Sequence, residues 1–210
     1  MRRSLFALSF ALFIAPAPAR AQVHPDPSAL PARDAHQGLV VAADPYYEEA
    51  RAKSRFGNKH PQSYGVLALE LFFRNDTDQP LRVSLDRILL VIEPPDARRQ
   101  RLEPLTVEDV LDRMLTKESP GPRVPRTRLP LPRKDSSKQW RKLESMLRSL
   151  ALEMGLLPPR STIHGFLFFD LDARWDWLTH SRLYVPEVKT FGGQPLLFFE
   201  VDLAPTVSPR

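Results

Sequence analysis

Residues 158–172, PPRSTIHGFLFFDLD, carry the strongest β-strand pattern in the chain. One set of alternate positions holds Ile163, Gly165, Leu167, Phe169 and Leu171, and the other includes Phe166 and Phe168. Because successive side chains of a strand point to opposite faces, this strand is apolar on both of them. That pattern is typical of a central strand in a sheet covered on both sides. We therefore predict such a strand over residues 162–172.

The polar residues of this strand raise the question of a catalytic group. His164 and Asp170 lie six residues apart in the sequence, which is about 20 Å along an extended strand. They therefore cannot form an acid–base pair within the strand. Glu70 or Glu200, from other predicted strands, could still approach them. We expect these acids to face solvent or to pair with arginine.

Other β-rich segments surround this one, at residues 37–43, 64–75, 81–93, 181–190 and 196–203. The polar turn NDTDQP, residues 75–80, joins two of them, and its side chains can hydrogen-bond their own backbone. We expect these two strands to pair as antiparallel neighbours. A proline within a strand marks an edge or a bulge, so Pro186 predicts one of these in segment 181–190. The glycines of residues 191–194 favour a tight turn before the last strand.

Helical patterns fill the region between the two groups of strands. Residues 106–117 and 137–154 each carry an apolar stripe at helical spacing, with Thr106 as N-cap and Gly155 as terminator. A shorter helix is predicted over about residues 45–56, before Gly57. The stripes should pack onto the sheet, since an amphipathic helix buries its apolar face.

The N-terminus has the layout of a secretory signal peptide. Two arginines precede an apolar run of 11 residues, and Ala19-Arg20-Ala21 forms an A-x-A cleavage site. The run is shorter than the roughly 20 residues that span a bilayer. Cleavage near Ala21 would yield an exported protein, periplasmic or extracellular, without a transmembrane segment. The chain has no cysteine, so neither disulfides nor cysteine-linked lipids are expected.

The remaining chain divides into a flexible segment, a domain and a tail. We assign residues 22–36 to the flexible segment, 37–204 to a single domain and 205–210 to the tail. A helical insertion at about 98–157 interrupts the domain. The three arginines of the signal peptide lower the formal net charge from +5 to +2 on removal. A net charge this close to neutral gives no electrostatic indication of nucleic-acid binding.

The segment of residues 121–134, GPRVPRTRLPLPRK, has four prolines, five basic residues and no acid. Such a composition favours an extended, solvated backbone, either as a stiff linker or as a docking arm. Candidate partner-binding residues are Arg123, Arg126, Arg128, Arg133 and Lys134 in this arm, together with Trp175 and Trp177. The two tryptophans would alternatively plug one end of the domain.

Motifs for the common reaction classes are missing from the sequence. There is no cysteine, no G-x-S-x-G, no H-E-x-x-H and no phosphate-binding glycine loop, and the five histidines are scattered singly. We therefore predict no enzymatic activity, no metal and no cofactor.

Two stretches resemble immunoglobulin-like domains of uncharacterised bacterial secreted proteins. Phe73-Arg74-Asn75, before the polar turn, and the strand from Pro159 through Asp170 match the recurring marks of these domains. The resemblance covers residues 37–95 and 158–204 and leaves out the helical insertion. It implies a mainly β, immunoglobulin-like β-sandwich, here α+β overall because of the insertion, with an extracytoplasmic, non-catalytic role. It transfers no site residues.

The leading hypothesis is an exported, non-catalytic interaction module that binds an envelope protein or an anionic envelope polymer. One alternative is a periplasmic hydrolase or carbohydrate-active enzyme that uses Glu70, Asp170 or Glu200. Such an enzyme needs two carboxylates within roughly 5–10 Å. Another alternative is a structural assembly subunit that pairs through sheet edges. The oligomeric state stays open.

Overall fold

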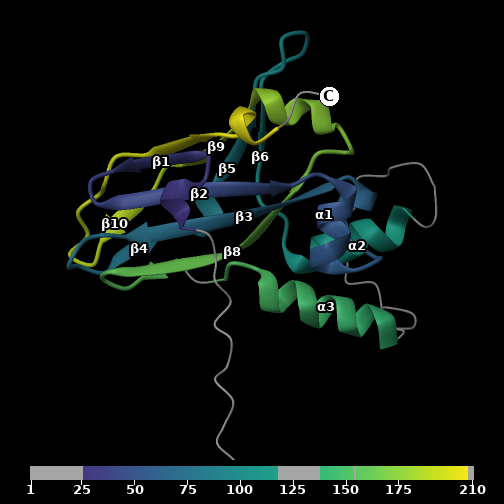
Figure 1. Ribbon diagram of the computed structural model, residues 1–210, viewed down its shortest axis with the longest axis horizontal. Helices are drawn as coiled ribbons and strands as arrows, with labels where there is room; N and C mark the ends of the chain where they lie inside the picture. The colour runs from purple at the N-terminus through teal and green to yellow at the C-terminus, as the bar shows by residue number, and fades with distance from the viewer. Residues whose placement is uncertain (1–25, 118–137, 154, 208–210) are drawn as a thin grey trace, which may run out of the picture.

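The computed structural model describes residues 26–117, 138–153 and 155–207. These residues form a mainly β structure with helices, an α+β architecture built on three antiparallel sheets (Figure 1). The strands are β1 (Arg33–His36), β2 (Leu39–Tyr46), β3 (Val66–Asn75), β4 (Leu81–Val83), β5 (Leu89–Ile92), β6 (Gln100–Leu102), β7 (Leu156–Leu157), β8 (Ser161–Asp170), β9 (Ser181–Val185), β10 (Val188–Thr190) and β11 (Phe199–Asp202). The helices are α1 (Glu49–Phe56), α2 (Val107–Lys117) and α3 (Lys138–Leu150), with short 3-10 helices η1 (Pro27–Ala29), η2 (Pro61–Tyr64), η3 (Leu85–Arg87), η4 (Trp175–His180) and η5 (Ala204–Thr206).

The strands are ordered β1-β2-β3-β8 in sheet A, β10-β4-β7 in sheet B and β11-β9-β5-β6 in sheet C. One face of sheet A packs against sheets B and C through the main core. Its largest contributors are Leu67, Leu69, Leu71, Phe73, Leu167 and Phe169 from sheet A, Leu81, Leu157 and Val188 from sheet B, and Leu90, Leu183, Phe199 and Val201 from sheet C. Each buried Leu or Phe contributes roughly 1.5–3 kcal/mol, so this core supplies most of the apolar stabilisation.

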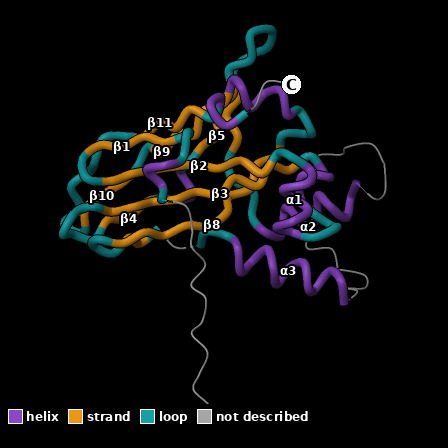
Figure 2. The backbone as a smooth tube through the Cα atoms, in the orientation of Figure 1, coloured by secondary structure: helices purple, strands orange, loops and turns teal. Residues whose placement is uncertain are grey.

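Helices cover the opposite face of sheet A. The helical core consists of Phe56, Val66, Ala68, Val107, Val110, Leu111, Met114, Leu143, Leu147, Phe166 and Phe168. Figure 2 shows α1, α2 and α3 gathered at one end of the strands. The predicted packing of the helical stripes onto the sheet is therefore confirmed. At the start of α2, Thr106 Oγ1 accepts from the Asp109 amide at 3.1 Å and the Asp109 carboxylate accepts from the Thr106 amide at 3.1 Å, a reciprocal N-cap.

Strand β8 confirms a strand that is apolar on both faces, although it runs over Ser161–Asp170 and ends two residues before the predicted end at residue 172. It is covered on both faces, by the main core and the helical core. It is nevertheless the edge strand of sheet A, so the prediction of a central strand was wrong. The amides of Leu105 and Leu152 donate to the carbonyls of Phe168 and Phe166, at 2.7 and 3.0 Å. Segments of the helical insertion thus cover the edge that another strand would otherwise pair with.

Two predicted strands each divide between two sheets. Segment 81–93 breaks at η3 into β4 of sheet B and β5 of sheet C, and segment 181–190 breaks at Pro186 into β9 and β10. The predicted pairing across the turn of residues 75–80 is therefore wrong, because β4 pairs with β10 and β7. The turn carries the chain from sheet A to sheet B. Pro186 likewise lies where the chain passes from β9 of sheet C to β10 of sheet B. Strand β9 itself is an inner strand of sheet C, so Pro186 does not mark it as an edge strand.

Three further features differ from the sequence-based expectations. Strand β1 and helix η1 lie within residues 22–36, where a flexible segment was predicted, and β6 lies within the predicted helical insertion. Both strands are short and lack an apolar alternation, so their order comes from pairing with β2 and β5. Helix α3 ends at Leu150, so Gly155 does not terminate it. Among the described residues, no helix is both long and apolar enough to cross a membrane.

Candidate functional site

The three carboxylates that a hydrolase would use do not converge. Asp170 and Asp172 both accept from Arg113, at 2.8 and 3.0 Å, and pairing with arginine is one of the two outcomes expected for the acids. For Glu70 that expectation was wrong, because Glu70 is buried and contacts Tyr46 and His164. Asp170 lies opposite Val66 on β3, four residues and about 13 Å along the strand from Glu70. Glu200 is exposed on β11 of sheet C.

Glu70 is the centre of a buried polar cluster across sheet A. Only 5% of Glu70 is exposed; its carboxylate accepts from the Tyr46 hydroxyl at 3.0 Å and lies 3.2 Å from His164 Nδ1. Burial, together with the Glu70 charge, raises the pKa of Tyr46. Asp44, directly opposite Glu70 in the register, pairs with Arg51. Because these acids already have partners, the cluster links three strands rather than presenting a free catalytic pair.

The sequence named Glu70 as a possible partner of His164 but did not identify Asp44 or Tyr46. The predicted strand ended at residue 43 and a helix was predicted from residue 45, whereas β2 continues to Tyr46 and α1 begins only at Glu49. The start of that predicted helix was therefore wrong, and Asp44 and Tyr46 lie two apart on one face of a strand. Within the described residues, no three His, Cys, Asp or Glu side chains are grouped to hold a metal ion.

The buried His60 should make the stability of the domain depend on pH. The residue is 2% exposed and contacts Ser63 Oγ, and burial lowers its pKa from the ordinary 6.5. The unfolded chain then binds a proton more readily than the folded protein below pH 6.5, so the free energy of unfolding should fall as the solution is acidified. Urea unfolding of wild type and His60→Gln, at pH 8 and at pH 5, measures this. The loss on acidification should be smaller in the variant, and equal losses would contradict the prediction.

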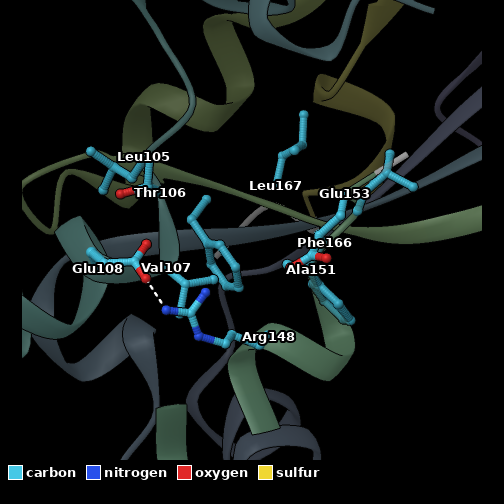
Figure 3. Close-up of a pocket in the computed structure, with 11 residues that line it drawn as sticks. Leu105, Thr106, Val107, Glu108, Arg148, Ala151, Glu153, Phe166 and Leu167 are labelled. Atoms are coloured by element: carbon cyan, nitrogen blue, oxygen red, sulfur yellow. Dashed lines mark hydrogen bonds and ion pairs between the residues drawn. The ribbon is translucent and has the colours of Figure 1, made fainter. Parts of the chain in front are cut away.

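A cavity of about 220 Å³ lies along the outer edge of β8 (Figure 3). It is lined by the start of α2, the end of α3 with the residues that follow it, and the middle of β8. The lining residues are Leu105, Thr106, Val107, Glu108, Arg148, Ala151, Leu152, Glu153, Phe166, Leu167 and Phe168. Arg148 forms an ion pair with Glu108 across the cavity and also contacts Glu144 at 3.3 Å.

The connection between β10 and β11, residues 191–198, is an exposed apolar loop. Five large apolar side chains are exposed in the described part of the chain, and three belong to this apolar loop: Phe191 at 75%, Leu197 at 64% and Phe198 at 51%. The loop is held in place by backbone bonds from Thr190 to Gln194 and from Leu196 to Val188, both 2.8 Å. A fixed loop that presents apolar side chains to solvent is a candidate contact surface.

The apolar loop lies at the end of the sheets away from α1, α2 and α3 (Figure 1). We call this the loop end; it comprises residues 37–38, 75–80, 158–160 and 191–198. Backbone bonds join these segments, from Asp76 to Gly38 at 2.7 Å, from Arg160 to Thr77 at 3.2 Å and from Phe191 to Pro80 at 3.1 Å. Charges near the loop end are paired, Arg160 with Asp78 at 2.9 Å and Lys189 with Glu187.

The residues predicted to bind a partner are placed only in part. Arg123, Arg126, Arg128, Arg133 and Lys134 lie outside the described residues, as does the predicted signal peptide. Trp175 and Trp177 are partly buried against the main core, and the Arg174 guanidinium lies 4.3 Å from the Trp177 ring centre. They therefore plug one end of the domain, and a role in binding stays a prediction. The sequence missed the apolar loop because Leu197 and Phe198 were assigned to a buried strand.

No protein-family model matches the chain, and no curated protein matches it. One similar solved structure is a crystal structure of a Bordetella pertussis protein described as ApaA. The two chains are 13% identical, the alignment covers 83% of this chain and 97% of the other, and the TM-score is 0.35. A second is the crystal structure of a functionally unknown protein from Listeria monocytogenes EGD-e. It is 12% identical, the alignment covers 72% of this chain and 68% of the other, and the TM-score is 0.34. At such TM-scores, neither similarity bears on the function of this chain.

Proposed function

We propose that the protein is an exported, non-catalytic interaction module with an immunoglobulin-like β-sandwich, which binds a protein partner through its loop end. The exposed apolar loop is the observation that carries this proposal. The signal-peptide layout of residues 1–21 supports export, and the two β layers around the main core support the sandwich.

The apolar loop has the properties of a binding surface. Burying an exposed Phe or Leu side chain contributes roughly 1.5–3 kcal/mol, which a partner can gain by covering Phe191, Leu197 and Phe198. Aromatic residues are enriched at protein interfaces. In immunoglobulin-like variable domains, the loops at one end of the sandwich form the binding site. The loop end of this protein likewise gathers several connections between strands at one end of the sheets, which supports the proposal.

The charges near the loop end favour a protein over an anionic polymer. Arg160 and Lys189 are already paired with Asp78 and Glu187, so they offer little attraction to a polyanion. A rim of mixed charges around an apolar centre is the usual composition of a protein interface. The arm of residues 121–134 has the opposite composition, basic and without acids, and is the element suited to an anionic envelope polymer.

In-cell photo-crosslinking tests which surface binds. A photo-crosslinking amino acid is placed at Phe191 or Phe198 in the apolar loop, at Arg126 in the arm, at Trp175, and, as control, at Ser54, an exposed residue of helix α1. The two loop positions should give the same discrete crosslinked protein, and Ser54 should give none. The substitutions Phe191→Ser and Leu197→Ser should abolish the adduct formed from position 198. They should change the free energy of unfolding by less than about 0.5 kcal/mol, since both side chains are exposed.

A crosslink from Arg126 alone would show that the arm, and not the apolar loop, is the binding surface. Crosslinks from Ser54 as strong as those from the loop would show that no specific surface exists. An adduct from position 198 that survives both serine substitutions would remove the apolar loop as the contact.

A further inference from the structure

The cavity beside β8 lies away from the loop end, and its walls are hydrogen-bonded to the strand. Backbone bonds from Leu105 to Phe168 and from Leu152 to Phe166 hold both walls to the strand edge. The cavity also lies where the two cores meet, because Leu167 belongs to the main core while Phe166 and Phe168 belong to the helical core. Such a site is preformed, so a ligand would not have to order it on binding.

The size and the walls of the cavity restrict the ligand. Its volume of about 220 Å³ is below the roughly 300–1,000 Å³ of typical small-molecule sites. The lining has an apolar part, with Val107, Ala151, Phe166 and Phe168 as members. A ligand of the size of one aromatic ring with a short chain therefore fits, and its hydrocarbon part has apolar side chains to contact.

The charged groups at the cavity are predominantly acidic. Glu108 and Glu153 line it, and Arg148 is the basic residue of the lining. Arg148 is shared between Glu108 and a third carboxylate, Glu144. The lining thus holds two carboxylates and one guanidinium, and this guanidinium already pairs with Glu108 and Glu144; the excess negative charge favours a cation. The end of α3 favours a cation as well, whereas the start of α2 favours an anion, so the two helix dipoles offset each other.

A ligand cation can replace Arg148 as the partner of Glu108 without leaving Arg148 unpaired. An incoming ammonium group can take the place of Arg148 on the Glu108 carboxylate. Arg148 then keeps Glu144, its neighbour one helical turn earlier, at 3.3 Å. Figure 3 shows Glu108 and Arg148 reaching toward each other from α2 and α3, so the exchange would take place at the cavity.

We propose that this cavity binds a small amphipathic amine, in which an aromatic or aliphatic group lies against Phe166 and Phe168 while the ammonium group pairs with Glu108, and Glu153 adds negative charge to the lining. This site goes beyond the proposed function, because it lies at a different end of the molecule and requires no macromolecular partner.

The test is an NMR titration of the purified protein with two probes of similar shape, phenethylamine and 3-phenylpropionate. Phenethylamine should shift the amide signals of Val107, Ala151 and Leu167 in a saturable manner. The carboxylate probe should bind at least about tenfold more weakly, because it meets like charge. The double variant Glu108→Gln with Glu153→Gln should weaken phenethylamine binding by a similar factor. The matched control Glu200→Gln, an exposed acid on sheet C, should leave it unchanged.

Thermal unfolding of the double variant, followed by circular dichroism, verifies that it is folded at the titration temperature. The proposal is overturned by the absence of saturable shifts up to about 20 mM phenethylamine, a range that covers millimolar binding. Equal binding of the two probes would also overturn it. So would shifts that the double variant does not reduce, or shifts confined to residues away from the cavity.

Discussion

Replacing Asn75 by alanine should lower the free energy of unfolding by about 3 kcal/mol, because one buried side chain holds several backbone groups. Asn75 is fully buried at the end of β3. Its amide nitrogen donates to the carbonyls of Gln79 and Pro158, at 2.7 and 3.1 Å. Its oxygen accepts from the amide and the hydroxyl of Thr77, at 2.9 and 2.7 Å. Alanine would leave these groups without their partner, at a cost of about 1–3 kcal/mol for each one that water cannot reach.

Urea unfolding of the purified protein measures this loss. The matched control is Asn58→Ala, which removes an exposed asparagine and should change the free energy of unfolding by less than about 0.5 kcal/mol. Asn75→Asp is the second variant. It keeps the acceptor for Thr77 but directs a carboxylate oxygen at two carbonyls, so it should be no more stable than the alanine variant at neutral pH. If Asn75→Ala costs no more than Asn58→Ala, the side chain does not hold the turn.

Gly155→Ala should be at least as damaging, with a loss of about 3 kcal/mol or more. A Cβ atom at this position would clash with the Val83 carbonyl oxygen and lie 3.0 Å from its carbonyl carbon. Both atoms belong to the backbone of β4, so no side-chain rotation makes room for the methyl group. The Val83 amide also donates to the Gly155 carbonyl at 2.7 Å, so the clash would push β4 away from the residue that leads into β7. Overpacking of a tight core alone costs about 1–3 kcal/mol.

The matched control for this variant is Gly192→Ala in the apolar loop. There the nearest atom to an added Cβ is Thr190 Oγ1 at 3.8 Å, an ordinary contact, so the change should be within about 0.5 kcal/mol. Thermal unfolding gives the loss for both variants, and hydrogen exchange of the Arg82 and Val83 amides locates it. If Gly155→Ala unfolds at the same temperature as Gly192→Ala, β4 can move away from residue 155 without cost, contrary to the prediction.

The sequence by itself determined most of the local elements. The alternation of Leu67, Leu69, Leu71 and Phe73 predicted β3 and the face that enters the main core. The helical stripe and the cap at Thr106 predicted α2 to within one residue. These features depend on residues that are neighbours in the chain, because side-chain periodicity and capping act over a few positions. The same holds for the absence of catalytic motifs, which can be read without a fold.

Only the tertiary structure decided which elements meet. The pattern around residues 75–80 suited a hairpin, yet β3 and β4 belong to different sheets. Local sequence cannot distinguish these outcomes, since partner choice depends on long-range packing that a strand pattern does not contain. The same long-range contacts bring Glu70, Tyr46 and His164 together and form the cavity beside β8. They also leave Leu197 and Phe198 outside the core, because burial depends on what covers a side chain and not on its hydrophobicity alone.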